Sequence, residues 1–238
     1  MNIGHHTNTN MPKSKKKTSA KKPSINATAS SSLEAVLRAA NGVRDVMTDF
    51  AAFSTFQRNG LDASVVNRHS AALSTAQRDA IFALFEHNMK DMYRDSDWGY
   101  DAHAKRQELF EDDARYLLVT RRQPATTTGT AHEQEDDEEL LGFVHFRFFE
   151  DDGAPVLYVY EIQIAAAAQR KGLGKFLMQL LQLVARRQRM ELVVLTVFKA
   201  NVAAMAFYLN TMKFVVDETS PSACGDDSQS YEILSKAV

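Results

Sequence analysis

The stretch VLYVYEIQIAAAAQRKGLGKFLMQLLQLVARR, residues 156–187, decides the fold. Residues 156–164 predict a strand, whereas residues 172–187 have the spacing of a long helix. The turn between them contains Gln169-Arg170-Lys171-Gly172-Leu173-Gly174. Glycines there would let backbone amides approach a pyrophosphate, whose negative charge the helix dipole favours. By itself such a motif more often marks an ordinary strand-to-helix turn, so its context must decide.

Two common nucleotide-binding motifs do not match this turn. A dinucleotide-binding fingerprint needs a third glycine and an acid about 20 residues further on. Here residue 177 is a leucine, and the next strand runs to Phe198 without an acid. A phosphate-binding loop of the Gly-Lys-Ser/Thr type is absent from the turn as well. The turn therefore predicts neither of these two classes of site.

The remaining elements indicate one mixed α/β domain. Helical spacing begins at Leu33, and a stronger helix is predicted from Thr75 to Tyr93, capped by Ser74 or Thr75. Residues 192–198 are a continuous apolar run, which is typical of a strand buried on both faces. The expected fold class is α/β, with a mixed central sheet and flanking helices. Further strands are predicted at 116–119, 140–148, 214–216 and 231–234, and a further helix at 201–212.

Two segments have too few apolar side chains to pack into a core. Residues 1–32 include six lysines between Lys13 and Lys22 and no acidic residue, and they predict a disordered basic tail. This tail is either merely solvated or a patch for a polyanion, an import factor or the ribosome. Residues 121–139 predict a flexible acidic loop. The folded domain is therefore expected at 33–238.

Composition excludes several classes of protein. The lone cysteine, Cys224, allows no internal disulfide and no cysteine-based metal site, so a reducing compartment is expected. No apolar run reaches the ~20 residues that span a bilayer, so no membrane partner is expected. A net charge of −2 indicates no partner by itself, and no sequence-specific nucleic-acid binding is expected.

Several short motifs occur together and in a fixed order. They are Met92-Tyr93-Arg-Asp-Ser-Asp-Trp98-Gly, Tyr158-Val-Tyr160-Glu161-Ile-Gln, Arg170-Lys-Gly-Leu-Gly-Lys-Phe176, Leu195-Thr-Val-Phe-Lys199 with Asn201, Ser220-Pro221-Ser222 and Ser230-Tyr231-Glu-Ile-Leu234. The glycine turn resembles the pyrophosphate loop of the GCN5-related N-acetyltransferase (GNAT) superfamily. The whole set, over roughly residues 50–235, resembles the N-alpha-acetyltransferase D family of histone N-terminal acetyltransferases.

This resemblance implies a single GNAT domain that uses acetyl-CoA as co-substrate, with no metal. It implies acetylation of the free N-terminal amine of histone tails that begin Ser-Gly-Arg-Gly, by a monomer in the cytoplasm and nucleus. Residues implied to bind the co-substrate are Ile162, Gln163, Ile164, Arg170, Lys171, Gly172, Leu173, Gly174, Lys175 and Asn201. Residues implied to bind the peptide are Tyr93, Trp98, Tyr158, Tyr160, Thr196 and Tyr231. Catalytic roles are implied for Glu161, Tyr160 and Tyr208.

The sequence departs from the family pattern at two positions. The family has an acid directly after Phe-Arg-Phe that helps to read the peptide, but here the residue is Phe149. One of the acids at 150–152 could replace it. Tyr208 stands at a position where the family pattern has Phe. In the wider superfamily a Tyr at this position often protonates the leaving thiolate. The residue that carries the proton is left open between Glu161, Tyr208 and Tyr231.

Individual residues have a second interpretation. Glu161, among apolar neighbours, is either a base for the amine or the partner of a Lys or Arg from another element. Tyr158 and Tyr160 share one face of the strand, and only a bulge could bring Glu161 beside Tyr160. Trp98 is either a core anchor or part of a site rim. His145 is expected to be a satisfied core histidine.

Three functions follow from these interpretations. The first is the histone N-terminal acetyltransferase, with direct transfer in a ternary complex, because Cys224 lies far in sequence from the co-substrate motif. The second is a GNAT enzyme that acts on lysine side chains or on a small amine. The third is an acyl-CoA-binding scaffold without catalytic activity.

Overall fold

The computed structural model describes residues 27–122 and 138–238. The expected basic tail lies mostly outside these ranges, and so does the main part of the expected acidic loop. The first helix, α1 (Ala27–Gly42), begins before the predicted start at Leu33. Residues 27–32 are Ala, Thr and Ser, and a helix that is already nucleated extends through such residues at little cost. Among the described residues, this helix thus begins six residues before the expected start of the domain at 33.

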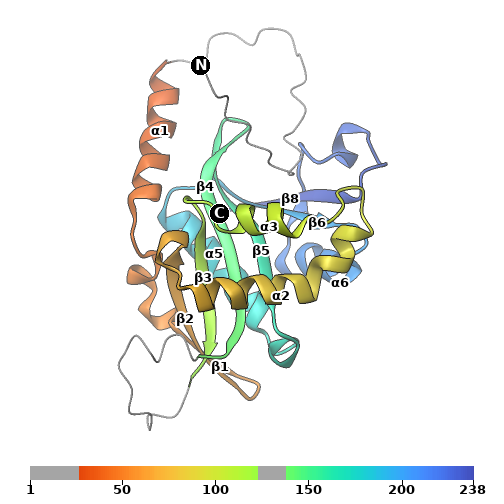
Figure 1. The fold of residues 1–238 in the computed structure, drawn as a ribbon. Helices are drawn as coiled ribbons and strands as arrows, with labels where there is room; N and C mark the ends of the chain where they lie inside the picture. Colours follow the sequence, from red (N-terminus) through yellow and green to blue (C-terminus); the bar gives the residue numbers. More distant parts are fainter. Residues whose placement is uncertain (1–26, 123–137) are drawn as a thin grey trace, which may run out of the picture.

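The centre of the fold is a mixed sheet (Figure 1). In the described part of the chain it has eight strands, in the order β1-β2-β3-β4-β5-β6-β8-β7. Neighbouring strands are antiparallel except for β5 and β6, which are parallel. The strands are β1 (Thr55–Arg58), β2 (Leu61–His69), β3 (Arg115–Arg121), β4 (Leu140–Asp151), β5 (Ala154–Ile164), β6 (Leu192–Phe198), β7 (Val215–Val216) and β8 (Tyr231–Ala237).

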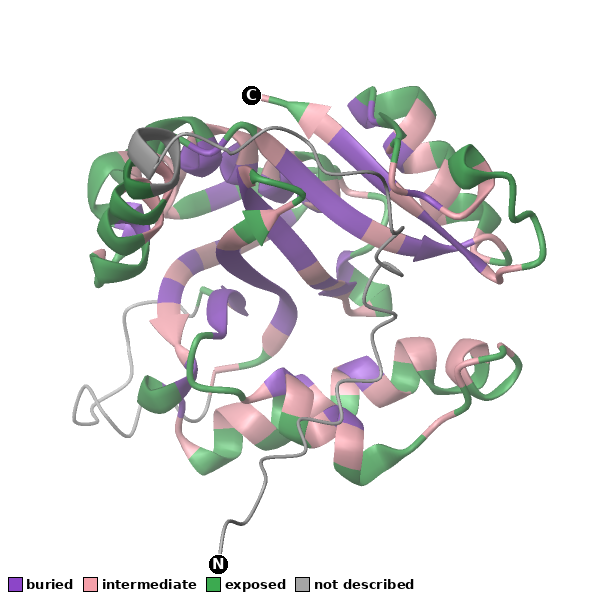
Figure 2. Ribbon diagram, turned by 90° about the horizontal axis from the view of Figure 1, so that it is seen from above, coloured by how far each residue is buried: buried purple, intermediate pink, exposed green. Residues whose placement is uncertain are grey.

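Helices cover both faces of the sheet (Figure 2). On one face, Leu181 of α5 belongs to the same hydrophobic cluster as Val144 of β4. On the other face, Phe85 of α2 and Leu109 of α3 form a second cluster with Leu118 of β3. These helices are α2 (Thr75–Arg94), α3 (Ala102–Leu109) and α5 (Leu173–Arg187); α6 (Val202–Ala206) follows β6 and continues as a π-helical segment at Phe207–Met212.

Two irregularities in the sheet shape the site. The parallel strands β5 and β6 are paired only as far as Val159 and Leu195, and beyond this point they separate. Next to the separation, the register between β4 and β5 shifts, because His145 pairs with Glu161 whereas Phe146 pairs with Val159. Tyr160 is the extra residue, so β5 carries the bulge that could bring Glu161 beside Tyr160.

The structure confirms the strands and helices predicted from residue 116 onward and adds elements that the sequence analysis missed. The hairpin of β1 and β2 turns at Asn59 and Gly60, both with positive φ, a pair that is a strong hairpin signal. Helix α3 was missed because its sequence is polar and has a weak apolar stripe. Its N-terminus is capped by the Asp101 side chain, which accepts hydrogen bonds from the amides of His103 and Ala104.

Candidate active site

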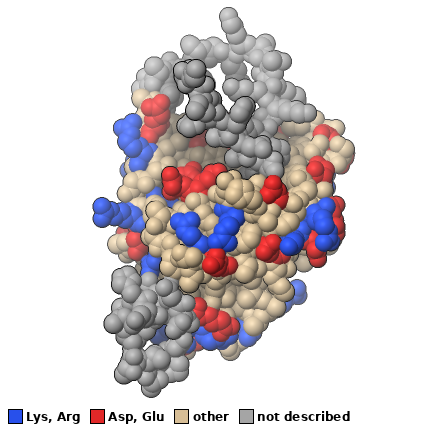
Figure 3. Space-filling view, viewed as in Figure 1, with Lys and Arg blue, Asp and Glu red and all other residues tan. Residues whose placement is uncertain are grey.

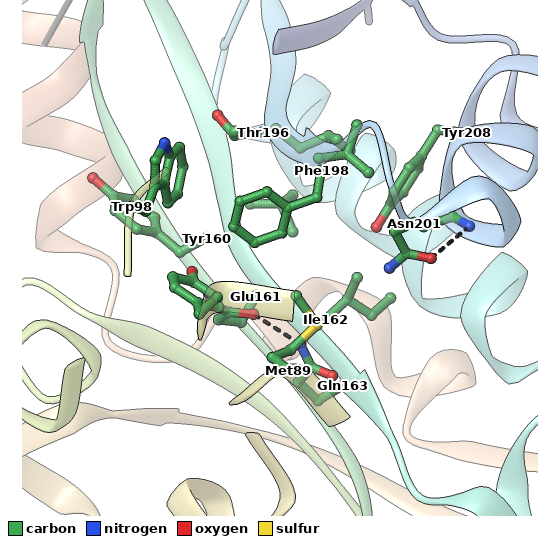
Figure 4. Close-up of a pocket in the computed structure, with 15 residues that line it drawn as sticks. Met89, Trp98, Tyr160, Glu161, Ile162, Gln163, Thr196, Phe198, Asn201 and Tyr208 are labelled. Atoms are coloured by element: carbon green, nitrogen blue, oxygen red, sulfur yellow. Dashed lines mark hydrogen bonds between the residues drawn. The ribbon is translucent and has the colours of Figure 1, made fainter. Parts of the chain in front are cut away.

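The candidate site is a cleft between β5 and β6, at the level where the two strands separate (Figure 4). Helix α2 closes one side, and α6 with the π-helical segment closes the other. The lining residues are Met89, Tyr93, Trp98, Val159, Tyr160, Glu161, Ile162, Gln163, Leu195, Thr196, Val197, Phe198, Asn201, Ala204 and Tyr208. The cleft thus joins residues that the resemblance assigned separately to catalysis, to the co-substrate and to the peptide.

Glu161 lies at the cleft wall with a side chain that is only 5% exposed. Its Oε1 atom is 2.8 Å from the ammonium of Lys105 on α3, and the Tyr93 hydroxyl donates to the same oxygen at 3.4 Å. Its Oε2 atom accepts a hydrogen bond from the Gln163 amide at 2.8 Å, drawn as a dashed line in Figure 4. The ion pair with another element, one of the two interpretations of Glu161, is therefore present. A carboxylate has roughly four acceptor positions, so this one can still accept a further hydrogen bond from the cleft.

Gln163 is itself held in place by α2. Its Oε1 atom accepts a hydrogen bond from the Asn88 amide at 3.0 Å, and Asn88 also donates to the Ile164 carbonyl. The side chain of Gln163 is buried and serves Glu161. The contact of Gln163 with the co-substrate, predicted from the resemblance, would therefore be made by its backbone atoms. These lie on the segment of β5 that does not pair with β6.

The bulge presents Tyr160 to the cleft beside Glu161. The Tyr160 ring stacks on His145 at 4.8 Å between centroids, and the Arg147 guanidinium lies 4.4 Å from its centroid. Burial raises the pKa of Tyr160 to about 12, although the charge of Arg147 opposes this rise. Its hydroxyl is therefore neutral at physiological pH, as a group that orients an amine or a carbonyl requires.

Aromatic side chains form the end of the cleft at Trp98. Trp98 contacts Tyr93, Phe198 and Tyr231 with ring centroids 5.0–5.9 Å apart. Trp98 is half-buried at the rim, so the rim interpretation is favoured over the core anchor. Tyr231 lies behind Trp98 and does not line the cleft itself. Phe198 was not predicted as a site residue, because at the end of an apolar strand it resembles any other core side chain.

Tyr158 and Thr196 are also joined to each other. Their hydroxyls form a short hydrogen bond across β5 and β6. Thr196 lines the cleft, whereas Tyr158 is buried beside it. The ring of Phe149 stacks on Tyr158. At the position where the family pattern has an acid, this chain therefore makes an apolar contact.

One of the neighbouring acids lies close to this aromatic group. Asp151 is half-buried, and burial together with the charges of Asp217 and Asp152 raises its pKa. Its charge contributes to the raised pKa of Tyr158. Glu150 and Asp152 are exposed. Asp151 is therefore the half-buried acid among residues 150–152 and the one whose charge acts on Tyr158.

The glycine turn supplies free backbone donors. Gly172 has the left-handed φ of +92°, which favours glycine, and it begins α5 without a side-chain cap among the described residues. By contrast, α2, α3 and α6 are capped by Ser74, Asp101 and Asn201. The first amides of α5 are thus left for a ligand, and a helix N-terminus of this kind attracts phosphate. Arg170, Lys171 and Lys175 add positive charge.

The turn packs tightly against the cleft. A Cβ atom on Gly174 would lie 3.4 Å from the Ile164 side chain and 3.7 Å from Phe207, so only a small residue leaves this contact undisturbed. The carbonyl of Lys171 accepts a hydrogen bond from Asn59 in the β1–β2 turn at 3.0 Å. The pyrophosphate turn, the open backbone of β5 and the cleft are therefore contiguous, which fits acetyl-CoA.

Tyr208 and Asn201 stand at the α6 side of the cleft (Figure 4). Asn201 caps α6 by accepting a hydrogen bond from the Ala204 amide at 3.1 Å. Burial, and to a smaller extent the charge of Glu161, raises the pKa of Tyr208. Tyr208 therefore keeps its proton at physiological pH, which a group that donates a proton needs.

A profile of the Acetyltransferase (GNAT) family matches residues 82–214, which is more than half of the chain. The chain belongs to the GNAT acetyltransferase family. It is accordingly an acyltransferase that uses acetyl-CoA as co-substrate. In the described ranges, no cluster of His, Cys, Asp or Glu could hold a metal ion. No described helix meets the length and hydropathy that a membrane span requires.

Two solved GNAT structures have the same fold at a TM-score of 0.50 or above. A GNAT acetyltransferase from Listeria monocytogenes is 13% identical with a TM-score of 0.50, over 77% of this chain and 99% of that chain. The GNAT domain of PAT from S. lividans is 13% identical with a TM-score of 0.51, over 78% of this chain and 94% of that chain. PaiA N-acetyltransferase from Thermoplasma acidophilum, solved with coenzyme A, is 15% identical with a TM-score of 0.49, over 74% and 99%.

Proposed function

We propose that this GNAT enzyme is an N-terminal acetyltransferase of the N-alpha-acetyltransferase D type. Its substrates are the free N-termini of histone tails that begin Ser-Gly-Arg-Gly, as in histone four and histone two-A. The observation that carries the proposal is the composition of the cleft. The aromatic rings of Trp98 and Tyr93 form one end of the cleft, and the Glu161 carboxylate lies in the wall beside them. An amine on a thin, extended chain end fits between rings and reaches a carboxylate.

The chain's own residues supply the proton transfers. Acetyl-CoA, when bound, supplies the thioester carbonyl that the amine attacks. The amine must first lose a proton, which Glu161 accepts through its remaining acceptor position, directly or through water. Tyr160 orients the amine or the carbonyl through its neutral hydroxyl, and Tyr208 holds a proton at its hydroxyl for the leaving sulfur. Direct transfer agrees with the position of Cys224, which is exposed in the loop before β8.

The substrate-reading groups are the rings and one acid. Ser at the first position would lie near Tyr93 and Trp98, and Gly at the second would let the peptide backbone pass close to the rings. Arg at the third position would pair with Asp151, since Phe149 offers only an apolar ring. A site that hydrogen-bonds a substrate group rejects analogues that lack it, because its own polar groups are left unpaired.

Acids near the cleft would add long-range attraction for a basic tail. On the face seen in Figure 3, acidic and basic side chains are interspersed. Two acids lie closer to the aromatic end, since the charges of Asp97 and Asp226 contribute to the raised pKa of Tyr231. These acids are near the aromatic end of the cleft and would attract the N-terminal residues of the substrate.

We expect a monomer in the cytoplasm and nucleus that meets histone N-termini there. The basic tail, expected at residues 1–32, would contact the ribosome or an import factor.

The test is a mass-spectrometric acetylation assay with a small panel of peptides. The panel contains Ser-Gly-Arg-Gly, the same peptide with a blocked N-terminus, Ser-Gly-Ala-Gly and Ser-Leu-Arg-Gly, each with an internal lysine further on. Tandem spectra should place acetyl on the α-amine of the first peptide, with sharply lower rates for the two substituted peptides and none for the blocked one. Acetyl on the lysine with the free N-terminus untouched would contradict the proposal and favour the lysine acetyltransferase alternative.

A further inference from the structure

A buried lysine lies behind the cleft wall and belongs to no motif found in the sequence. Lys105 projects from α3, and its side chain is only 5% exposed. Its ammonium is 2.7 Å from Glu108, 2.8 Å from Glu161 and 3.0 Å from the Tyr93 hydroxyl, so all three of its protons have acceptors. It also lies over the rings of Phe85 and Tyr93, at about 5 Å from their centroids.

The charges of this cluster do not cancel. One ammonium, on Lys105, faces two carboxylates, on Glu108 and Glu161, and this leaves one negative charge in excess. Of the two carboxylates, Glu161 is the one that lines the cleft. Burying a lone carboxylate costs several kcal/mol, and the ammonium offsets this cost while the excess charge remains available to a cationic amine.

We propose that Lys105 is a positioning residue for acetyl transfer, because its ammonium, 2.8 Å from Oε1, holds the Glu161 carboxylate in a fixed orientation at the cleft wall. The inference rests on the proposed role of Glu161 as the group that accepts the amine proton. Gln163 fixes the second carboxylate oxygen, so together the two donors leave Glu161 little freedom to rotate.

The other titratable groups around Glu161 keep one protonation state near neutral pH. Burial raises the pKa of Tyr93, of Tyr116 and of Tyr208, so these three phenols stay protonated. Burial holds the pKa of His145, the residue opposite Glu161 in the sheet, well below its usual range, so this imidazole stays neutral. The pKa of Lys105 is raised well above its usual range by Glu161, Tyr93 and Glu108 against the opposing effect of burial. A difference between variants in the acid limb of the pH profile therefore does not come from these groups, and the α-amine of the peptide titrates alike for every variant.

The experiment replaces Lys105 with methionine, which keeps the length of the stem between Phe85 and Tyr93. Without its cation, a buried carboxylate takes up a proton more readily. The acid limb of the kcat/KM profile should therefore move upward by at least about one pH unit, so that activity is low at neutral pH and recovers as the pH rises. Binding of acetyl-CoA, measured by calorimetry, should change little, because Lys105 lies behind the wall and away from the glycine turn.

Matched variants separate this effect from a general loss of packing. Lys90→Met removes an exposed lysine that pairs with Glu86 on α2, and it should leave the profile unchanged. If Lys105→Met does not fold, the double variant Lys105→Met/Glu108→Gln removes one positive and one negative charge and keeps the net charge of the cluster. Its acid limb should move upward too. If the acid limb of the kcat/KM profile of the folded Lys105 variant lies at the same pH as that of the wild type, the inference is overturned, even if the rate is lower.

A second readout needs no acceptor peptide. In protein with ¹³C-labelled glutamate side chains, the Glu161 carboxyl signal is assigned by its loss in Glu161→Gln, and its titration midpoint should rise in Lys105→Met. An unchanged midpoint would overturn the inference. If that midpoint rises but Ser-Gly-Arg-Gly is not acetylated, the positioning of Glu161 stands and the histone substrate fails. If Glu161→Gln retains full activity, the catalytic role of Glu161 fails and the positioning role fails with it.

Discussion

The Nε2 atom of His145 accepts a hydrogen bond from Nε of Arg147, at 3.1 Å, in the middle of the sheet. The proton of the neutral imidazole is therefore on Nδ1, which has no hydrogen-bond partner within the described ranges. His145 is fully buried between the rings of Tyr116 and Tyr160. It is thus the core histidine that the sequence predicted, but only one of its two nitrogens is satisfied.

This arrangement makes the stability of the fold depend on pH. The pKa of His145 is lowered in the folded state, so below its ordinary value of 6.5 the unfolded chain binds a proton that the folded chain does not. The stabilisation is complete above that value and is lost as the pH falls toward the lowered pKa. Between pH 7.5 and 5.5 the loss from this one group should be about 1 kcal/mol. Urea unfolding at the two pH values should show a smaller loss in His145→Gln than in the wild type. The exposed His103→Gln should behave as the wild type, and equal losses in all three proteins would contradict the assignment.

Glu161→Gln keeps the shape of the side chain and removes its charge. Removal of a general base typically costs about 10²- to 10⁴-fold in rate, and we expect a loss in this range at neutral pH. The deficit should shrink at high pH, where the amine has already lost its proton. Steady-state kinetics across pH would measure this. Wild-type turnover at neutral pH would mean that another residue, such as Tyr208 or Tyr231, carries the proton.

Tyr208→Phe tests the opposite proton transfer. The raised pKa of Tyr208 keeps its hydroxyl protonated, and removal of that hydroxyl should lower kcat by about 10²-fold or more if it donates a proton to the leaving sulfur. The KM for acetyl-CoA should change little, because the ring and its packing against Phe214 remain. Unchanged kcat would show that solvent or another group supplies the proton at this site.

Gly172→Val tests the glycine turn. At a φ of +92° a β-branched residue is strained, and any relaxation of the turn displaces the amides that should bind the pyrophosphate. We expect acetyl-CoA affinity, measured by calorimetry, to fall at least about tenfold, a loss of ~1.4 kcal/mol. Gly225→Val, at a left-handed glycine in the loop before β8, is the matched control and should leave the affinity unchanged. Equal affinity in folded Gly172→Val would remove the basis for placing the pyrophosphate there.

Asp151→Asn tests how the third residue of the peptide is read. If Asp151 pairs with the arginine, this variant should raise the KM for Ser-Gly-Arg-Gly and leave the KM for Ser-Gly-Ala-Gly nearly unchanged. Asp152→Asn, at the neighbouring exposed turn position, should have little effect. The wild-type KM for the arginine peptide should also rise with salt, because screening weakens the attraction of exposed charges. The same KM change with both peptides would exclude Asp151 as the arginine partner.

Local sequence was sufficient for the elements from residue 116 onward and for the place of the glycine turn between a strand and a helix. The period of apolar residues placed β5, α5 and β6, and Gly172 and Gly174 between a strand and a helix marked the turn, because those features depend only on neighbours in the chain. The resemblance added roles for Glu161 and Trp98, which both line the cleft. Helix α3 was not predicted, since a polar helix with one buried lysine has no apolar stripe to detect.

Only the tertiary structure decided the environment of those residues. Sequence left Glu161 either as a base or as an ion-pair partner, because its neighbours along β5 say nothing about a lysine on α3. Packing of α2 and α3 on the sheet brings Lys105 to within 2.8 Å of Glu161. The bulge at Tyr160 turns β5 so that the side chains of Tyr160 and Glu161 line one cleft. The sequence alone thus determined the fold class and the position of the glycine turn before α5. Charge pairing and orientation in the cleft depend on contacts between distant segments, which only the folded chain creates.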